Sequence, residues 1–100
     1  MKKALLIGAA AASLSLVAPA SAPAAVRDCS APVDFNLRIT SARNMTCGAA
    51  RFDMKRYRGS IRYRFRTPAG FTCTRVSGGP LGGNWRCVKG TRAYRFAFAD

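Results

Sequence analysis

The fold is indicated most clearly by residues 70–98, GFTCTRVSGGPLGGNWRCVKGTRAYRFAF. This stretch contains three strand-like segments separated by two turns. The second turn is the dipeptide at 90–91, and a two-residue turn with glycine first is typical of a tight type II′ hairpin. This turn pairs Lys89 with Arg92. The further pairs predicted along these two strands are Cys87 with Tyr94 and Trp85 with Phe96.

The first turn of this stretch closes over the glycine-rich segment at 78–83. If Val76 pairs with Asn84, then Cys73 falls opposite Cys87, and the two hairpin registers agree on which side chains share a face. One predicted face is aromatic and holds Phe71, Cys73, Trp85, Cys87, Tyr94, Phe96 and Phe98. The opposite predicted face is mixed and holds Thr72, Thr74, Arg86, Val88, Ala93, Arg95 and Ala97.

The four cysteines predict two disulfides rather than a metal site, because the chain has no histidine and no Cys-x-x-Cys pair. The strand register predicts the pair Cys73–Cys87, which leaves Cys29–Cys47 by exclusion. Each closed loop of this length stabilises a fold by about 3 kcal/mol. No metal and no cofactor is expected.

The segment SIRYRFRTP, residues 60–68, alternates arginine with apolar residues and predicts a further strand. A five-residue loop at 66–70 would pair Phe65 with Phe71 and place Ile61, Tyr63 and Phe65 in the core. A four-residue loop would instead turn Arg64 and Arg66 inward, and each buried arginine would cost several kcal/mol of desolvation. The arginines therefore point outward and define a candidate polyanion patch of Arg62, Arg64, Arg66, Arg86 and Arg95.

The segments before this meander predict a short strand and one helix. Phe35, Leu37 and Ile39 alternate with polar residues, and residues 22–28 read as a loose arm. The helix is expected to begin after the N-cap Thr46 and to stop at Gly59. Its predicted buried stripe is Cys47, Ala50, Met54 and Tyr57. The expected fold is α+β: a short N-terminal strand, one helix, and an antiparallel meander of three to four strands with the helix packed on one face.

Residues 1–24 have the charged start, apolar run and small-residue end of a secretory signal peptide, with cleavage after Ala20 or Ala24. Residues 25–100 then form a single small disulfide-bonded domain without a transmembrane anchor. Loss of Lys2 and Lys3 leaves 15 basic residues against four aspartates, a net charge of +11. The protein is expected to be secreted, extracellular or associated with the cell wall.

Catalysis is not expected, because the chain has no histidine and no glutamate to supply an acid-base pair. The aspartates are expected to be solvated or salt-bridged, with Asp53 on the polar side of the helix. Sequence-specific nucleic-acid binding is not expected either, because the rings and the arginines lie on different faces. The glycine-rich tip lacks the residues of a phosphate loop and is a candidate partner-contact loop: Gly78, Gly79, Pro80, Leu81, Gly82 and Gly83.

Three motifs, NMTC-x-x-A, GFTC and CVKG-x-x-x-YRF, resemble the pattern of small secreted four-cysteine actinobacterial proteins of unknown function. The matching positions are Asn44, Thr46, Cys47, Ala50, Gly70, Phe71, Cys73, Cys87, Gly90 and Phe96. The resemblance spans residues 37–98 and implies a fold and export, with no assigned activity and no catalytic residues.

The sequence therefore predicts a non-enzymatic cationic domain that binds an acidic polymer, an envelope component or a protein. A cationic antimicrobial or toxin-like protein is one alternative. An inhibitor of a secreted enzyme, with the tip at 78–83 inserted into its target, is the other.

Overall fold

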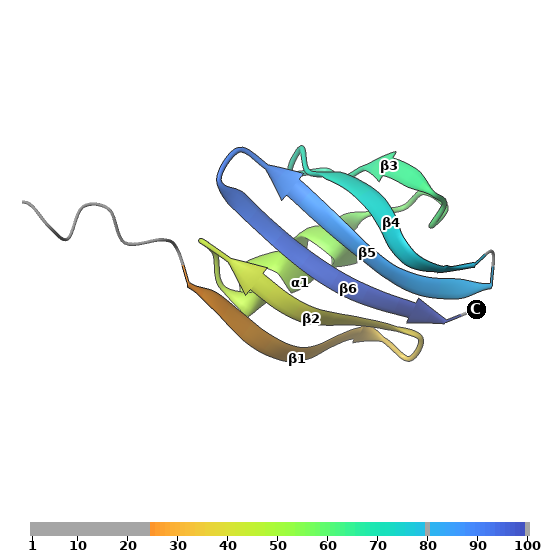
Figure 1. Ribbon diagram of the computed structural model, residues 1–100, viewed down its shortest axis with the longest axis horizontal. Helices are drawn as coiled ribbons and strands as arrows, with labels where there is room; N and C mark the ends of the chain where they lie inside the picture. Colours follow the sequence, from red (N-terminus) through yellow and green to blue (C-terminus); the bar gives the residue numbers. More distant parts are fainter. Residues whose placement is uncertain (1–24, 80, 100) are drawn as a thin grey trace, which may run out of the picture.

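The computed structural model describes residues 25–79 and 81–99, and the predicted signal peptide lies outside this range. Two strands precede the only helix of this range, and four strands follow it (Figure 1). The elements are β1 (Val26–Asp34), β2 (Leu37–Arg43), α1 (Cys47–Arg56), β3 (Arg64–Arg66), β4 (Thr72–Gly79), β5 (Gly82–Lys89) and β6 (Arg92–Ala99). None of the described helical segments is long and apolar enough to cross a membrane.

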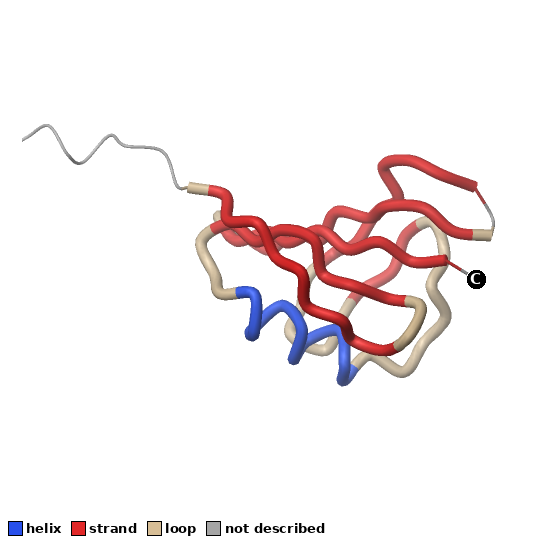
Figure 2. Tube along the Cα trace, turned by 90° about the horizontal axis from the view of Figure 1, so that it is seen from below, coloured by secondary structure: helices blue, strands red, loops and turns tan. Residues whose placement is uncertain are grey.

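The strands form one six-stranded antiparallel sheet in the order β1-β2-β6-β5-β4-β3. The β1–β2 hairpin extends the sheet because β2 pairs with β6, the last strand of the chain. Helix α1 packs on one side of the sheet, mainly against β1 and β2 (Figure 2). The α+β class with a helix on one face is confirmed, whereas the expected number of strands was too small.

Strand β1 is the main element that the sequence did not predict. Val26 pairs with Arg43, so the end of the expected loose arm is part of the sheet. The sequence of β1 lacks an apolar alternation and contains Pro32, which an edge strand tolerates because its missing N–H can face solvent. Phe35 was expected to point inward but lies in the β1–β2 turn and is 100% exposed. The Asn36 N–H donates to Asp34 Oδ1 at 3.1 Å, which stabilises this turn.

The predicted registers of the last two hairpins are confirmed in their central parts. The pairs Lys89 with Arg92 and Cys73 with Cys87 are both present. The pair Val76 with Asn84 is wrong, because a β-bulge between Arg75 and Ser77 leaves Val76 unpaired. The glycines on either side of the tip belong to β4 and β5, so these strands are longer than expected.

The register predicted for β3 is wrong by two residues. Phe65 pairs with Cys73 rather than with Phe71, although Phe65 still faces the core as expected. The shift moves Tyr63 beyond the covered part of the sheet, where it is 58% exposed and lies beside Arg75. Ile61 is only partly buried.

Helix α1 begins at the predicted position and ends earlier than expected. Thr46 is the N-cap, and its Oγ1 accepts a hydrogen bond from the Ala49 N–H at 3.0 Å. The helix ends at Arg56 because Tyr57 adopts an extended backbone, and the Tyr57 ring stacks on Phe65 at 4.5 Å between centroids. Ala50 and Met54 are buried as predicted, whereas Cys47 and Tyr57 are only half-buried.

The core lies between α1 and the aromatic face of the sheet. The Trp85 and Phe96 rings stack across β5 and β6 with centroids 5.3 Å apart. The indole N–H of Trp85 donates to the Arg62 carbonyl at 2.9 Å and thereby holds the segment before β3. The two disulfides of the structure are Cys29–Cys47, which ties β1 to the start of α1, and Cys73–Cys87, which joins β4 to β5. These are the partners that the sequence predicted.

Asp53 is a buried residue, which corrects the expectation that it would be solvated. Its side chain is 2% exposed, and it accepts hydrogen bonds from the Tyr94 hydroxyl at 2.8 Å and the Ala69 N–H at 2.9 Å. Burial, reinforced by Asp53, raises the pKa of the Tyr94 hydroxyl far above its usual range. These contacts could not be predicted from local sequence patterns, because they join α1 to residues that are 16 and 41 positions away.

Candidate anion-binding face

The side of the sheet that faces away from α1 is rich in arginine, and we call it the open face. In β5 and β6 its side chains alternate with the buried aromatic residues, so Arg86 and Arg95 point away from the core. The face continues across β2 and β3 on either side. Its arginines are Arg38, Arg43, Arg64, Arg66, Arg86 and Arg95.

One row of paired residues crosses this face from β2 to β3. The row starts at Ser41, which pairs with Arg95, and Arg95 pairs directly with Arg86. It continues from Arg86 through Thr74 to Arg64. Like charges directly opposite each other in an antiparallel pair are destabilising, so the Arg86–Arg95 pair is an unfavourable feature of the free protein.

A β-bulge in β2 adds Arg43 to this face. The register of β2 against β6 shifts between Ile39 and Ser41, so that Ala42 is buried instead of Ser41. Without the shift, strict alternation from Ile39 would have directed Ser41 and Arg43 toward the core. Regular alternation of the sequence therefore does not predict Ser41 or Arg43 on the open face. The only available sign was that Ala42 is the apolar residue at the end of this strand and lies three positions after Ile39.

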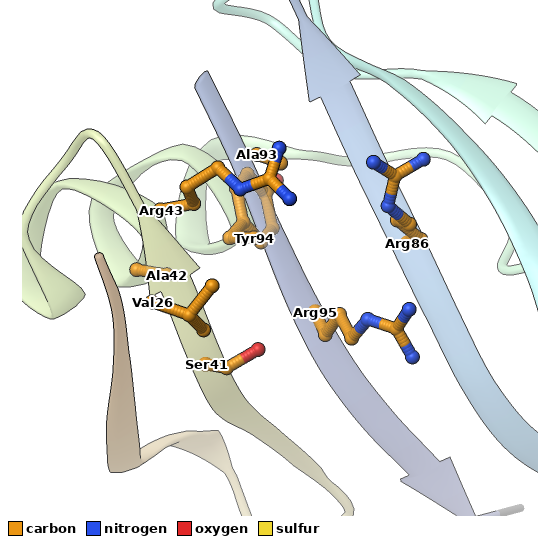
Figure 3. Close-up of a pocket in the computed structure, with 8 residues that line it drawn as sticks. All are labelled: Val26, Ser41, Ala42, Arg43, Arg86, Ala93, Tyr94 and Arg95. Atoms are coloured by element: carbon orange, nitrogen blue, oxygen red, sulfur yellow. The ribbon is translucent and has the colours of Figure 1, made fainter. Parts of the chain in front are cut away.

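Arg43, Arg86 and Arg95 line one cavity of about 250 Å³ on the open face. Figure 3 shows the Arg43 side chain reaching from β2 over β6, with Arg95 directed toward β5 and Arg86 rising from β5. Ser41 contributes its hydroxyl group, and Ala93 is a small, 8% exposed residue of the lining. The other lining residues are Val26, Ala42 and Tyr94.

The cavity supplies hydrogen-bond donors and positive charge. Three guanidinium groups carry five N–H donors each, and the Ser41 hydroxyl can donate as well. Among the described residues that line the cavity, none carries a carboxylate, a thiol or an imidazole. In the described part of the chain no three potential metal-binding side chains of His, Cys, Asp or Glu cluster together. This lining can therefore bind and orient an anion.

The other residues of the predicted polyanion patch lie elsewhere. Arg64 and Arg66 border a separate depression with Thr72 at the β3 edge of the open face. Arg62 precedes β3 and does not line either depression, and its charge acts on the Tyr57 hydroxyl. Burial raises the pKa of that hydroxyl, and Arg62 partly opposes the effect.

The candidate partner-contact loop includes Pro80, which lies outside the described residues, and its other residues lie at the end of the β4–β5 hairpin. Gly78 pairs with Gly83, and both adopt positive φ angles of 102° and 152°. A side chain at either position would collide with the backbone of the opposite strand, so this narrow ribbon requires glycine. Leu81 is 73% exposed beyond the ribbon. Figure 1 shows that this hairpin end and the β1–β2 turn lie at the same end of the molecule as the end of β6.

Comparisons with protein-family models, with curated proteins and with solved structures find no match to this chain. The resemblance to small secreted four-cysteine actinobacterial proteins therefore stays a prediction. The functional interpretation rests on the geometry of the open face.

Proposed function

We propose that this protein is a secreted, non-enzymatic cationic domain that binds a polyanion of the cell envelope or the extracellular space through its open face. The observation that carries this proposal is the cavity shared by Arg43, Arg86 and Arg95. Clustered arginines on one face attract polyanions more strongly than the same charges spread over the whole surface.

Export is the part of this proposal that explains the two disulfides. Disulfides persist in oxidising compartments, and both cysteine pairs of this chain are bonded. Residues 1–24 have the composition of a signal peptide that would deliver the chain to such a compartment.

Binding, rather than catalysis or membrane damage, agrees with the placement of the side chains. The described lining of the cavity includes the Ser41 hydroxyl but no carboxylate, imidazole or lysine that could activate it as a nucleophile. Membrane disruption by an amphipathic surface requires a large exposed apolar face. Trp85, Phe71 and Phe96 are buried in the core, and the exposed Phe35, Phe52 and Leu81 come from three separate segments of the chain.

The test compares retention of the purified, oxidised protein on immobilised polyphosphate during elution with rising NaCl. One triple variant carries Arg43→Gln, Arg86→Gln and Arg95→Gln. The matched control carries Lys55→Gln, Arg56→Gln and Arg58→Gln, which remove the same charge from α1 and the residues directly after it. We expect the open-face variant to elute at lower salt than the control, with a salt dependence reduced by about one unit of slope per lost contact. Elution of both variants at the same salt would show that only net charge matters and would refute the proposal.

A second candidate function, inhibition of a secreted enzyme by the β4–β5 hairpin end, is supported by the exposure of Leu81. A narrow glycine ribbon with an apolar tip can enter a cleft of a partner protein. Affinity capture from culture supernatant with Leu81→Ser beside the wild type tests this function. A partner that the wild type retains and Leu81→Ser loses would support it, and equal retention would exclude the tip as the contact.

A further inference from the structure

We infer that the cavity between β2, β6 and β5 is a site for one tetrahedral oxyanion, a phosphate or sulfate group carried by the bound polymer. This inference rests on the proposed function of the open face and specifies the chemical group that it recognises. The site consists of Arg43, Arg86, Arg95 and the hydroxyl of Ser41.

The number and origin of the donors favour a tetrahedral group. The three arginines come from three adjacent strands and line one cavity, and Figure 3 shows Arg43 reaching over β6 while Arg95 extends toward Arg86 on β5. A guanidinium donates in a planar fork that engages two acceptor oxygens. A single carboxylate has two oxygens and can satisfy one such fork, whereas a phosphate monoester or a sulfate ester on a polymer exposes three oxygens and can accept from more than one fork.

The Arg86–Arg95 pair gives an independent reason to expect an anion at this place. The two residues are direct cross-strand partners, and Arg43 comes from the neighbouring strand to line the same cavity. Each close positive charge raises the free energy of the unliganded face. A phosphate monoester, with a charge of about −1.5 to −2, offsets more of this repulsion than a sulfate ester with a charge of −1, so part of the binding energy comes from relief of an unfavourable arrangement.

The positions of the donors are fixed by the sheet rather than by loops. Arg86 and Arg95 lie in the middle of paired strands, and the β2 bulge directs Ser41 and Arg43 to the same face. The small side chain of Ala93 leaves room for a ligand to approach the backbone of β6. A backbone that is held in place before binding avoids the cost of ordering a loop, so only the rotamer freedom of the arginine side chains is lost when the ligand arrives.

The depression at the β3 edge offers a matched comparison on the same face. It contains Arg64, Arg66 and Thr72, so it has two guanidinium groups, and both come from one short strand. This depression therefore has positive charge, but its guanidinium donors all come from β3 rather than from several strands. We expect it to strengthen polyanion binding without distinguishing one kind of anion from another.

The experiment measures the affinity of the oxidised protein for inorganic phosphate, sulfate and malonate by following backbone amide NMR shifts of residues 41–43, 86 and 93–95. Malonate matches the charge of sulfate but divides it between two carboxylates. We expect phosphate and sulfate to bind about tenfold more tightly than malonate, an effect comparable to one charge-assisted hydrogen bond. Equal affinity for sulfate and malonate in the wild type would overturn the inference, and this outcome needs no variant.

Variants that keep the charge separate geometry from electrostatics. The variant Arg43→Lys, Arg86→Lys and Arg95→Lys should still be retained on polyphosphate, but its preference for sulfate over malonate should fall to about one, because lysine lacks the fork. The control Arg64→Lys with Arg66→Lys should keep the wild-type preference. An unchanged preference in the cavity variant would contradict the site.

The source of the anion is distinguished by three further arms: a soluble polymer that carries phosphate monoesters, a sulfated polysaccharide, and vesicles that contain phosphatidic acid. Tighter binding to any one of these than to polyglutamate of similar charge supports the site and identifies the source. Failure to prefer any of them over polyglutamate contradicts the site. If polyglutamate binds as well as the phosphate polymers and the open-face Gln variant weakens both, the proposed function stands and only the oxyanion inference fails.

Discussion

The two faces of the sheet are made from alternate residues of the same strands, and they have opposite chemical roles. The covered face holds stacked rings, both members of the Cys73–Cys87 bond and the buried Asp53–Tyr94 pair. The open face holds six arginines, two of which are paired directly across β5 and β6. Stability therefore comes from one face, and the other face is left free to carry a destabilising concentration of charge.

This division predicts that changes on the covered face alter the free energy of unfolding and that changes on the open face alter anion binding. A domain of this size has a small core, so losses on the covered face are severe.

Trp85→Ala should give the largest loss. It removes the ring that stacks on Phe96 and the indole donor to the Arg62 carbonyl. We expect the free energy of unfolding to fall by about 3–5 kcal/mol, measured by chemical denaturation under oxidising conditions. The exposed Tyr63→Ala is the control and should cost less than about 1 kcal/mol. Equal losses for the two variants would show that burial of the Trp85 ring is not a main source of stability.

Cys73→Ala with Cys87→Ala should lower the free energy of unfolding by about 3 kcal/mol, because the bond closes a loop of 14 residues. The same denaturation experiment measures this change. A loss below about 0.5 kcal/mol would show that the strand pairing and the aromatic core alone hold β4 to β5.

Tyr94→Phe should cost about 1–3 kcal/mol, because it removes one hydrogen-bond donor from the buried Asp53 carboxylate. The raised pKa of Tyr94 also predicts a pH dependence. The folded state keeps the tyrosine proton above pH ~10, where the unfolded state releases it, so this stabilisation is fully present below pH ~10 and is lost as the pH rises further. The alkaline decrease in unfolding free energy should be smaller in Tyr94→Phe than in Tyr63→Phe. An identical decrease in both variants would exclude Tyr94 as its source.

Arg86→Gln should have the smallest effect and the opposite sign. Removal of one member of the Arg86–Arg95 pair should raise the free energy of unfolding by about 0.2–1 kcal/mol at low ionic strength. The gain should shrink at about 1 M salt, where charges are screened within a few ångströms. Arg38→Gln is the control, because Arg38 pairs with Ala97 and should give no comparable gain. A loss of stability in Arg86→Gln would show that this arginine supports the fold.

The sequence predicted the region from β4 to β6 best, because glycine turns and alternating aromatic residues set its registers together. Both disulfide pairings followed from these registers. Strand β1 was missed because its sequence has no apolar period and owes its pairing to β2. Asp53 was misplaced because its partners come from distant segments of the chain.

Two of the four residues of the candidate site could also be predicted from the sequence. Alternation placed Arg86 and Arg95 on one face, and the structure brings them together in the cavity. The positions of Ser41 and Arg43 on the open face could not be predicted, because the β-bulge between Ile39 and Ser41 reverses which side chains of β2 face the core from there on. Arg62 was assigned to the patch by extending the β3 alternation past the point where strand pairing ends.

Anion binding by the open face is tested most directly by mapping backbone amide NMR shifts while the oxidised protein is titrated with polyphosphate. If the open face binds the polymer, we expect saturable shifts that are concentrated at residues 41–43, 86 and 93–95, with weaker shifts at Arg64 and Arg66. Lys55 and Arg56 on α1 should remain nearly unchanged. Shifts of similar size on α1 and on the open face would contradict the claim that one face of the sheet is the anion-binding surface.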